Sequence, residues 1–499
     1  MTAERAPRAL EDLPEHVSVL VAGGGPSGLV AALDLTRRGI DCLVVEPREQ
    51  VDPFRPRAKT TNARTMTLLR ALGVADRLRA ASPLTADYSE DVVFATGVAG
   101  HELRRFRHAF QLYRDGFAHA PEIGQRVPQP VVEEVLQRRI RADYVVAADG
   151  GASAVRKSLG IPLQGSSAPR PNVNVFRSRE LADRVTLGDA VQYWIVGPVS
   201  GMLGRLDLDE RWWAIVQGVD PEQGADPADL VRALAGVDVD VEVLGSDPWT
   251  ARMLLAESYG RGRVFLVGDA AHLNPPWGGH GFNTCVVDAL NLTWKLAEVL
   301  QGRAGSALLD SYAAERRPAA ARMIETAAAN GTALAYSFVV PGLADDGPVG
   351  DAARAEVGER LAVKDAEFHA EGIVFGYTSA DSPIVVPDGT RPPPDDPVVH
   401  HPSACPGGIL PHLWLSDGRS VYDALGPRFT LLAARDLPDG APSGDLGDCA
   451  VVELPEADRD AALGAWERPF VLVRPDGHVA WRGEHPDQVA DALRRSLWR

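Results

Sequence analysis

Residues able to hold a polar cofactor are concentrated in residues 263–300. The apolar run at 264–267 has the length of a buried strand, and Gly268-Asp269 places a carboxylate at its carboxyl end. A glycine-rich segment, residues 274–281 (the glycine loop), would let backbone N–H groups approach a ligand closely. Apolar residues at helical spacing then predict a helix whose positive N-terminus lies at this loop. The segment predicts a cofactor site, with an ordinary βα unit as the alternative.

A second glycine motif lies near the N-terminus. A strand predicted at 17–22 leads into residues 23–28 (the glycine turn), where Gly23, Gly25 and Gly28 form GxGxxG and open a helix to about Arg38. The next strand, 42–45, ends in Glu46, 18 residues after Gly28. A tight turn, close approach to a pyrophosphate and an acid for ribose hydroxyls are the parts of a dinucleotide site. Glycine-rich packing is the alternative, and the flanking strands favour the dinucleotide site.

Other polar candidates have two interpretations each. The basic segment 53–70 could cover a pyrophosphate or could be a solvated helix start. His272 and His280 could act as bases, although loop histidines beside a cofactor are more often structural. We interpret the pair His400-His401, in a linker, as solvated rather than metal-binding. The sequence shows no Ser/His/Asp set and no paired carboxylates for catalysis.

Composition restricts the class of protein. The chain has 499 residues, 45% of them hydrophobic and 24% charged, which predicts about three domains with ample core. A net charge of -17 argues against binding nucleic acid or an anionic membrane. Four scattered cysteines show no CxxC or zinc spacing, so free thiols in a reducing compartment are expected. Residues 1–16 do not resemble a signal peptide, and no window reaches the ~20 apolar residues of a membrane span. We therefore expect a cytoplasmic location.

The remaining segments predict further domains. Residues 83–123 are irregular and cross into a second domain, where short runs between 172 and 219 predict an antiparallel sheet. Adjacent residues point to opposite faces of a strand, so at most one member of Tyr193-Trp194 and one of Trp212-Trp213 can face a pocket. Core packing is the first interpretation of these aromatics and a substrate wall is the alternative. Helices are expected at 128–140 and 308–330, and a small α/β domain follows the linker at 381–411.

A third motif completes a resemblance to a known family. The strand predicted at 143–149 ends in Asp149-Gly150-x-x-Ser153-x-Val155-Arg156. Together with the glycine turn and the glycine loop, this motif resembles the FAD-dependent aromatic hydroxylases of the para-hydroxybenzoate hydroxylase fold. Within that group the chain looks most like the phenol, hydroxyphenylpropionate and polyketide hydroxylases.

The resemblance implies the positions of the FAD contacts, with Asp269 at the ribityl chain and the glycine loop at the flavin ring. The implied cofactor-binding residues are Gly23, Gly25, Pro26, Ser27, Gly28, Glu46, Arg57, Gln129, Asp149, Arg156, Gly268, Asp269, Pro276, Gly278, Gly279, His280, Gly281, Phe282 and Asn283.

The resemblance also implies the fold class and domain organisation. An α/β, Rossmann-like FAD-binding domain of the glutathione-reductase type is expected at 13–85, 121–165 and 256–335. An antiparallel-sheet substrate domain is expected at 86–120 and 166–255, a helical segment and linker at 336–395, and a thioredoxin-like domain without CxxC at 396–499. Relatives carry several dozen more residues between the equivalents of Leu136 and Asp143, including a parallel strand, so this chain resembles a relative with an internal deletion.

The implied activity is that of an FAD- and NAD(P)H-dependent monooxygenase. Such an enzyme hydroxylates a phenolic or polyketide-type aromatic substrate with O₂ through a C4a-hydroperoxyflavin, and NADPH or NADH reduces the flavin. The flavin carries the chemistry, so no catalytic side chain and no metal is assigned. A homo-oligomer is possible. The alternatives are Baeyer–Villiger-type oxygenation, flavin dehydrogenation, or a non-catalytic relative that binds FAD poorly.

Overall fold

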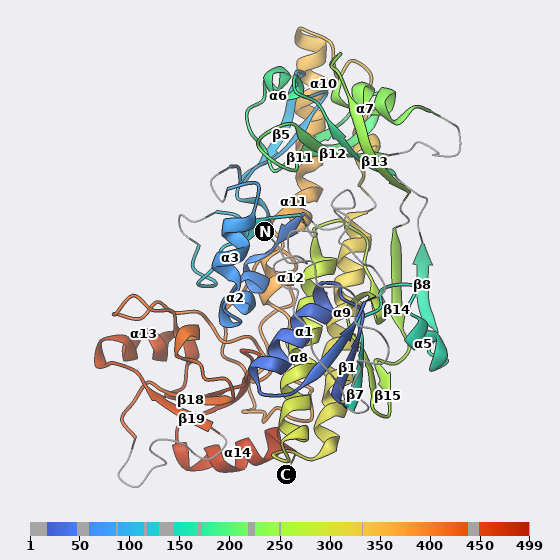
Figure 1. The fold of residues 1–499 in the computed structure, drawn as a ribbon. Coiled ribbons are helices and arrows are strands. Elements are labelled where there is room, and N and C mark those ends of the chain that lie inside the picture. The colour runs from blue at the N-terminus through green and yellow to red at the C-terminus, as the bar shows by residue number, and fades with distance from the viewer. Residues whose placement is uncertain are drawn as a thin grey trace.

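The computed structural model describes residues 17–46, 59–85, 88–113, 117–128, 143–167, 172–217, 225–248, 251–331, 333–437 and 449–498. Figure 1 shows three parts: a sheet with short helices at the top, a second sheet with long helices at the lower right, and a C-terminal domain at the lower left. The predicted helix at 128–140 lies mostly outside the described residues, as do Arg57 and Gln129.

The lower sheet has the order β15-β16-β7-β1-β2. Its strands are β15 (Gly260–Arg261), β16 (Val264–Leu266), β7 (Asp143–Ala147), β1 (Ser18–Ala22) and β2 (Cys42–Val45). The last four run parallel, so their carboxyl ends meet at one edge of the sheet. Three helices cover this sheet: α1 (Pro26–Arg37), α8 (His280–Leu300) and α9 (Asp310–Asn330). The strands and helices predicted around both glycine motifs are therefore present, with ends shifted by one or two residues.

Strand β2 lies at the edge of this sheet where the segment missing between Leu136 and Asp143 would be expected. In the part of the chain that the structure describes, β2 has no neighbour on its outer side, and Val45 at its end is 50% exposed. Relatives are expected to place a further parallel strand on this adenine side. The loss of that strand stays a prediction, because residues 47–58 and 129–142 lie outside the described residues.

The upper sheet has seven strands in the order β13-β9-β12-β11-β10-β4-β5. They are β13 (Glu242–Pro248), β9 (Asn172–Arg177), β12 (Arg211–Gln217), β11 (Ser200–Arg205), β10 (Gln192–Ile195), β4 (Val92–Ala95) and β5 (Glu102–Phe106). All neighbours are antiparallel except the pair β10 and β4. The predicted antiparallel sheet is thus confirmed, with two strands from the segment before residue 113.

The two faces of this sheet separate the adjacent aromatic pairs as predicted. Tyr193 and Trp212 lie in the outer cluster with α7 (Pro227–Ala235). Trp194 and Trp213 lie in the inner cluster, which also contains Trp277 from the glycine loop. The inner face of the sheet is therefore packed against the elements that carry the glycine loop.

The C-terminal domain contains a four-stranded sheet in the order β19-β18-β20-β21. Its elements are β18 (Phe429–Ala433), β19 (Cys449–Glu453), α13 (Glu456–Trp466), β20 (Phe470–Val473), β21 (Val479–Gly483) and α14 (Val489–Ser496). The small α/β domain predicted after the linker is present, and its thioredoxin-like relationship stays a prediction.

Short elements connect these parts. They are β3 (Thr60–Thr61), α2 (Ala63–Ala71), α3 (Ala75–Ala81), η2 (Ala109–Gln111), β6 (Gln125–Arg126), α5 (Ala154–Ser158), β8 (Leu163–Ser167), α6 (Leu181–Arg184), β14 (Arg252–Ala256), η4 (Gly268–Ala270), β17 (His272–Leu273), η5 (Ser306–Leu309), η6 (Ala335–Phe338), α10 (Pro348–Arg360), η7 (Leu361–Lys364), α11 (Asp365–Phe368), α12 (Glu371–Phe375), η8 (Val421–Ala424) and η9 (Pro486–Gln488).

One linker prediction is wrong. His401 is exposed, but His400 is only partly exposed and its ring lies 5.2 Å from the ring of His119 and 5.6 Å from that of Phe375. Burial lowers the pKa of His400 to about 4. The linker lies against the loop before Ile123. This contact partly buries His400, which the local sequence alone predicted to be solvated.

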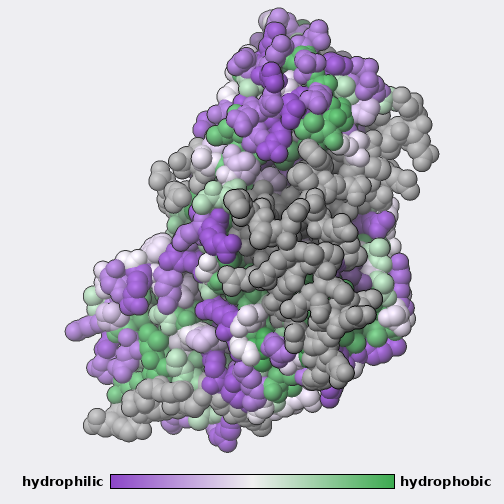
Figure 2. Space-filling view, viewed as in Figure 1, coloured by the Kyte–Doolittle hydropathy of each residue, from purple (hydrophilic) through white to green (hydrophobic). Residues whose placement is uncertain are grey.

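The surface in Figure 2 is mostly hydrophilic at the upper end, over the seven-stranded sheet and its short helices. Smaller hydrophobic groups lie among these residues, so this end presents a largely polar surface. Among the helices that the structure describes, none has the length and apolarity needed to cross a membrane.

Candidate cofactor and substrate site

Four strand ends of the lower sheet bring the predicted cofactor residues together. The glycine turn follows β1, Glu46 follows β2, Asp149 follows β7 with one residue between, and Asp269 lies just after β16. Because these strands are parallel and adjacent, the polar residues after them share one edge of the sheet. The three motifs identified in the sequence therefore form one surface.

The glycine turn leaves an open space above the N-terminus of α1. A Cβ on Gly28 would lie 2.0 Å from the carbonyl oxygen of Gly23, so Gly28 is needed for close packing. A Cβ on Gly25, the N-cap of α1, would have no heavy atom of a described residue within 4 Å. A helix N-terminus with free space above it is suited to a phosphate group.

Glu46 contacts the glycine turn directly. The backbone N–H of Gly24 donates to Oε2 of Glu46 at 2.6 Å, and the side chain is partly exposed. The acid predicted for ribose hydroxyls therefore also fixes the turn.

Asp149 and Arg156 each have one buried polar atom without a hydrogen-bond partner among the described residues. Oδ2 of Asp149 accepts from the N–H groups of Ala154 and Val155 at 2.8 and 3.1 Å, at the start of α5. Arg156 is 5% exposed and donates from Nη2 to the carbonyl oxygen of Gly151 at 3.3 Å. Among the described residues, Oδ1 of Asp149 and Nε of Arg156 are buried without a hydrogen-bond partner. Both atoms could bind a ligand.

Asp269 presents an exposed carboxylate at the end of β16. The Cys285 thiol donates to its Oδ1 at 3.5 Å, and a Cβ on Gly268 would lie 2.5 Å from Oγ of Ser27. Asp269 is thus held between the starts of α1 and α8, with its carboxylate open to hydroxyl donors.

The glycine loop is tied to the segment before α2. Gly278 and Gly279 have positive φ angles of 86° and 69°, which bring the loop into the start of α8. Oδ1 of Asn283 accepts from the N–H of Asn62 at 2.9 Å, and its Nδ2 donates to the carbonyl oxygen of Gly279 at 2.8 Å. Asn283 therefore positions the loop through both ends of its amide.

A buried charge network that the sequence did not reveal lies beneath the loop. Oδ2 of Asp288 is 2.7 Å from Nε2 of His272, and its Oδ1 accepts from Nε of Arg316 at 2.8 Å. Burial lowers the pKa of His272, but the Asp288 carboxylate outweighs it and the net pKa is raised. The other ring nitrogen of His272 lies 2.9 Å from Oδ1 of Asn274, so both nitrogens contact protein side chains, which favours the structural interpretation over that of a base.

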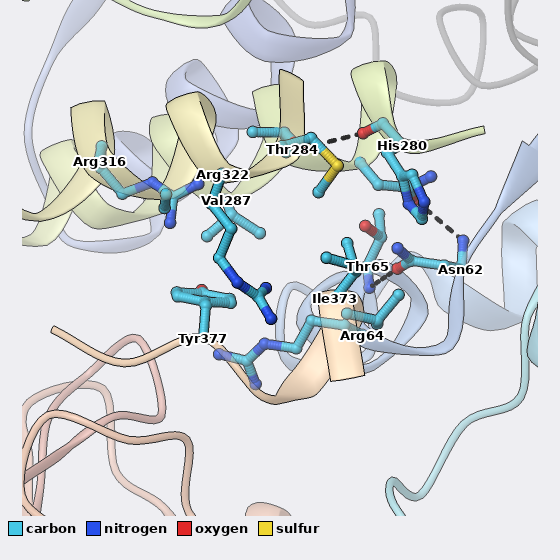
Figure 3. Close-up of a pocket in the computed structure, with 14 residues that line it drawn as sticks. Asn62, Arg64, Thr65, His280, Thr284, Val287, Arg316, Arg322, Ile373 and Tyr377 are labelled. Carbon is cyan, nitrogen blue, oxygen red and sulfur yellow. Dashed lines mark hydrogen bonds between the residues drawn. The ribbon is translucent and has the colours of Figure 1, made fainter. Parts of the chain in front are cut away.

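His280 at the start of α8 is 3% exposed and lines a cavity beside α2 and α9 (Figure 3). Burial lowers its pKa to about 4, and the charge of Arg322 adds to the effect. His280 is therefore neutral at pH 7, and its Nε2 lies beside Gly278, where an added Cβ would be 2.4 Å away.

We expect acidification from pH 6.5 to pH 4 to reduce the unfolding free energy of the wild type by about 3 kcal/mol more than that of His280→Gln. The folded-state pKa of about 4 lies below the usual 6.5, so the unfolded state binds the proton first and stability falls as the pH drops through this window. Urea unfolding at several pH values measures the difference. The exposed His401→Gln is the control, and parallel pH profiles for wild type and His280→Gln would contradict the assignment.

Two basic side chains, the partly buried Lys59 and the buried Arg126, lie at the inner face of the upper sheet. Nζ of Lys59 is 4.2 Å from the ring centroid of Trp213, and burial together with the charge of Arg126 lowers the pKa of Lys59 to about 7. Arg126 is 4% exposed and donates from Nη2 to the carbonyl oxygen of Arg205 at 3.0 Å. No described residue accepts from its Nε or Nη1. An aromatic wall beside such cations suits a phenolate or another electron-rich oxygen.

A second buried pair supports the glycine loop from α11. Glu367 accepts from the backbone N–H of Gly278 and forms an ion pair with Lys364. Burial raises the pKa of Glu367, and Lys364 reverses this only in part. Nζ of Lys364 is 4.6 Å from the ring centroid of Trp194, so the pair links the loop to the inner face of the sheet. No local motif around 364–367 could have indicated this contact.

A small cavity lies between these groups, beside the glycine loop. Its lining residues are Thr60, Asn62, Phe110, Gln111, Gly278, Gly279, His280, Asn283, Glu367, Ala370 and Val374. The φ angles of His108, Phe110 and Gln111 are positive, at 57°, 59° and 56°. This backbone conformation is unusual for residues other than glycine and is often found at functional sites.

The described residues fit FAD. The space above Gly25 suits the pyrophosphate, the exposed Asp269 suits the ribityl hydroxyls, and the unpartnered atoms of Asp149 and Arg156 remain for further contacts. The contributions predicted for Arg57 and Gln129 lie outside the described residues.

Comparisons with known proteins agree with this geometry. The family profile described as "FAD binding domain" matches residues 16–137 and 107–327, and the profile described as "Aromatic-ring hydroxylase, C-terminal" matches residues 403–499. A putative polyketide hydroxylase of Streptomyces halstedii is 34% identical over 570 positions, which cover 99% of this chain and 98% of that protein.

Solved structures of flavin-dependent enzymes are also similar to this chain. RebC with bound 7-carboxy-K252c has 33% identity and a TM-score of 0.87, and the match covers 97% of this chain and 99% of that chain. The flavin-dependent monooxygenase PieE, in complex with FAD and substrate, has 28% identity and a TM-score of 0.85, with 97% and 100% covered.

The sequence alignment also bears on the predicted deletion. It runs over 570 positions although this chain has 499 residues, so more than 70 positions of the Streptomyces halstedii protein face gaps in this chain. The first family profile matches in two pieces, which overlap at residues 107–137.

Proposed function

Because the chain belongs to the FAD-dependent aromatic-ring hydroxylases, we propose that it transfers one oxygen atom of O₂ to a phenolic or polyketide-type ring, with NADH or NADPH as electron donor. The observation that carries this proposal is the placement of one cofactor surface, built from four adjacent strand ends, next to an aromatic sheet face that carries the basic side chains of Lys59 and Arg126.

When bound, FAD supplies the electrons taken from the nicotinamide and activates O₂ for transfer. The residues of this chain bind and orient the reactants. The N-terminus of α8 would stabilise negative charge on the flavin ring, and Asn283 would hold the loop at that end. Lys59 and Arg126 would bind the phenolic oxygen and favour its ionised form, which makes the ring more nucleophilic. The packed aromatic face would exclude water.

The direct test uses the purified protein with FAD. Oxidation of NADH and of NADPH is followed in the presence and absence of simple phenols and polycyclic aromatic compounds, and the products are analysed by mass spectrometry. We expect faster oxidation with an aromatic substrate and a product heavier by one oxygen. An ester formed beside a ketone would indicate Baeyer–Villiger chemistry instead, and loss of two hydrogens would indicate dehydrogenation.

Asp269→Ala is expected to weaken FAD binding by roughly 10- to 100-fold, because hydrogen bonds to a charged group contribute about 1.5–3 kcal/mol. Flavin content after purification and titration of the flavin-free protein measure the change. Asp310→Ala, which removes another exposed carboxylate at the start of α9, is the control. Equal flavin retention in wild type and Asp269→Ala would refute the role of Asp269.

A further inference from the structure

The cavity behind His280 carries an excess of positive charge (Figure 3). It lies among α2, α8, α9, α12 and the segment after α12. Its fourteen lining residues are Asn62, Arg64, Thr65, His280, Asn283, Thr284, Val287, Arg316, Ala319, Arg322, Met323, Ile373, Val374 and Tyr377. Three of them are arginines and none is acidic.

The three arginines differ in how their charge is balanced. Arg316 is paired with the buried Asp288, and Arg322 forms an ion pair with Asp395, whose side chain is 69% exposed. Arg64 is 3% exposed and donates from Nη2 to the carbonyl oxygen of Asp476 at 2.8 Å. Within the described part of the chain, no carboxylate is near enough to form an ion pair with Arg64. Burying a charged guanidinium without an ion-pair partner costs folding free energy unless an anion binds beside it.

The cavity also gathers polar atoms without partners. Among the described residues, four lining side chains bury such an atom: Nε of Arg64, Oγ1 of Thr65, Nε2 of His280 and the hydroxyl of Tyr377. Figure 3 shows the guanidinium groups of Arg64 and Arg322 directed into the same space, with Tyr377 beside them. Arg64 and Arg322 therefore bring two guanidinium groups to one cavity whose lining has no acidic side chain.

We propose that this cavity binds a small monovalent inorganic anion of the size of chloride. Its volume, about 30 Å³, exceeds the ~10–15 Å³ needed by one water-sized occupant and excludes a nucleotide or an aromatic substrate. Arginine N–H groups are donors only, so an anion that accepts several hydrogen bonds satisfies them better than water, which must also donate. The anion would join α2 and α9 to the segment that leads to the C-terminal domain. This inference does not depend on the proposed oxygenation.

The test compares chloride with gluconate, which is too large for the cavity, at constant ionic strength and with FAD bound. Chloride is expected to raise the melting temperature by roughly 2 °C for each tenfold increase above its dissociation constant. The shift should disappear in Arg64→Met. It should persist in Arg70→Met, which removes an arginine from the same helix that is already paired with Glu122 and Asp423.

Crystals grown in bromide locate the ion directly. An anomalous peak between the guanidinium groups of Arg64 and Arg322 and the Tyr377 hydroxyl would support the site. A water molecule at that point, or equal melting temperatures of the wild type in chloride and gluconate, would overturn it. If Arg64→Met does not fold, Tyr377→Phe removes one donor and keeps the ring, and it should reduce the chloride shift.

Discussion

Glu315→Gln is expected to lower the unfolding free energy by about 3–5 kcal/mol, the typical effect of removing one partner from a buried ion pair. Glu315 on α9 accepts from Nη1 and Nη2 of Arg474 at 2.7 and 2.8 Å and from Nζ of Lys295 at 2.9 Å. The side chains of all three residues are at most 1% exposed. The variant would leave two buried cations without this carboxylate.

This network is a buried polar contact between the C-terminal domain and the cofactor-binding helices α8 and α9. Arg474 also binds Asp476 at 2.6 Å, and Asp476 accepts from Nε1 of Trp294 and Nδ2 of Asn291 on α8. The domain thereby holds α8, whose N-terminus forms the end of the glycine loop. This contact agrees with the structural role expected for a domain without CxxC, and that role stays a prediction.

Urea unfolding followed by tryptophan fluorescence is the measurement, because Trp294 lies within the network. Glu325→Gln, an exposed position on the same helix, is the control and should change stability by less than ~0.5 kcal/mol. Burial raises the pKa of Glu315, but Arg474 and Lys295 outweigh it, so the pKa lies well below the usual 4.5. The difference in unfolding free energy between wild type and Glu315→Gln should have its full value above pH 4.5 and should decrease as the pH falls below 4.5. A difference below ~1 kcal/mol at pH 7 would show that the network is not essential.

Local patterns in the sequence were sufficient for the elements and for the cofactor edge. The apolar runs before Gly23, Asp149 and Asp269 each predicted a strand followed by a polar turn, and parallel pairing places these turns together. The period of two along β10 and β12 was enough to assign opposite faces to the paired aromatics.

Contacts between distant segments could not be predicted in this way. Glu315 and Arg474 are separated by 159 residues, and their pairing depends on how the C-terminal domain docks. The same is true of Glu367 beneath Gly278 and of Arg126 beside Lys59, since neither residue belongs to a local motif. Partial burial of His400 also follows from a contact with a distant loop. Such contacts determine pKa values and loop positions, which is why the site's electrostatics were visible only in the structure.

Gly25→Val is expected to reduce FAD affinity by at least roughly 100-fold, because the new side chain would fill the space above the N-terminus of α1 and separate the pyrophosphate from the backbone N–H groups. The folded protein should tolerate the change. A Cβ at Gly25 meets no heavy atom of the described residues within 4 Å, and the φ of -74° at Gly25 is accessible to valine.

Two further variants separate ligand exclusion from damage to the fold. Gly464→Val adds the same side chain at another glycine with open space, in α13, and should retain both stability and flavin. Gly28→Ala should destabilise even the flavin-free protein, because its Cβ would lie 2.0 Å from the carbonyl oxygen of Gly23. Melting temperatures of the flavin-free proteins and fluorescence titrations with FAD give both quantities. Since only Gly25→Val is expected to lose flavin without losing stability, stoichiometric FAD in that variant would place the pyrophosphate somewhere other than the glycine turn.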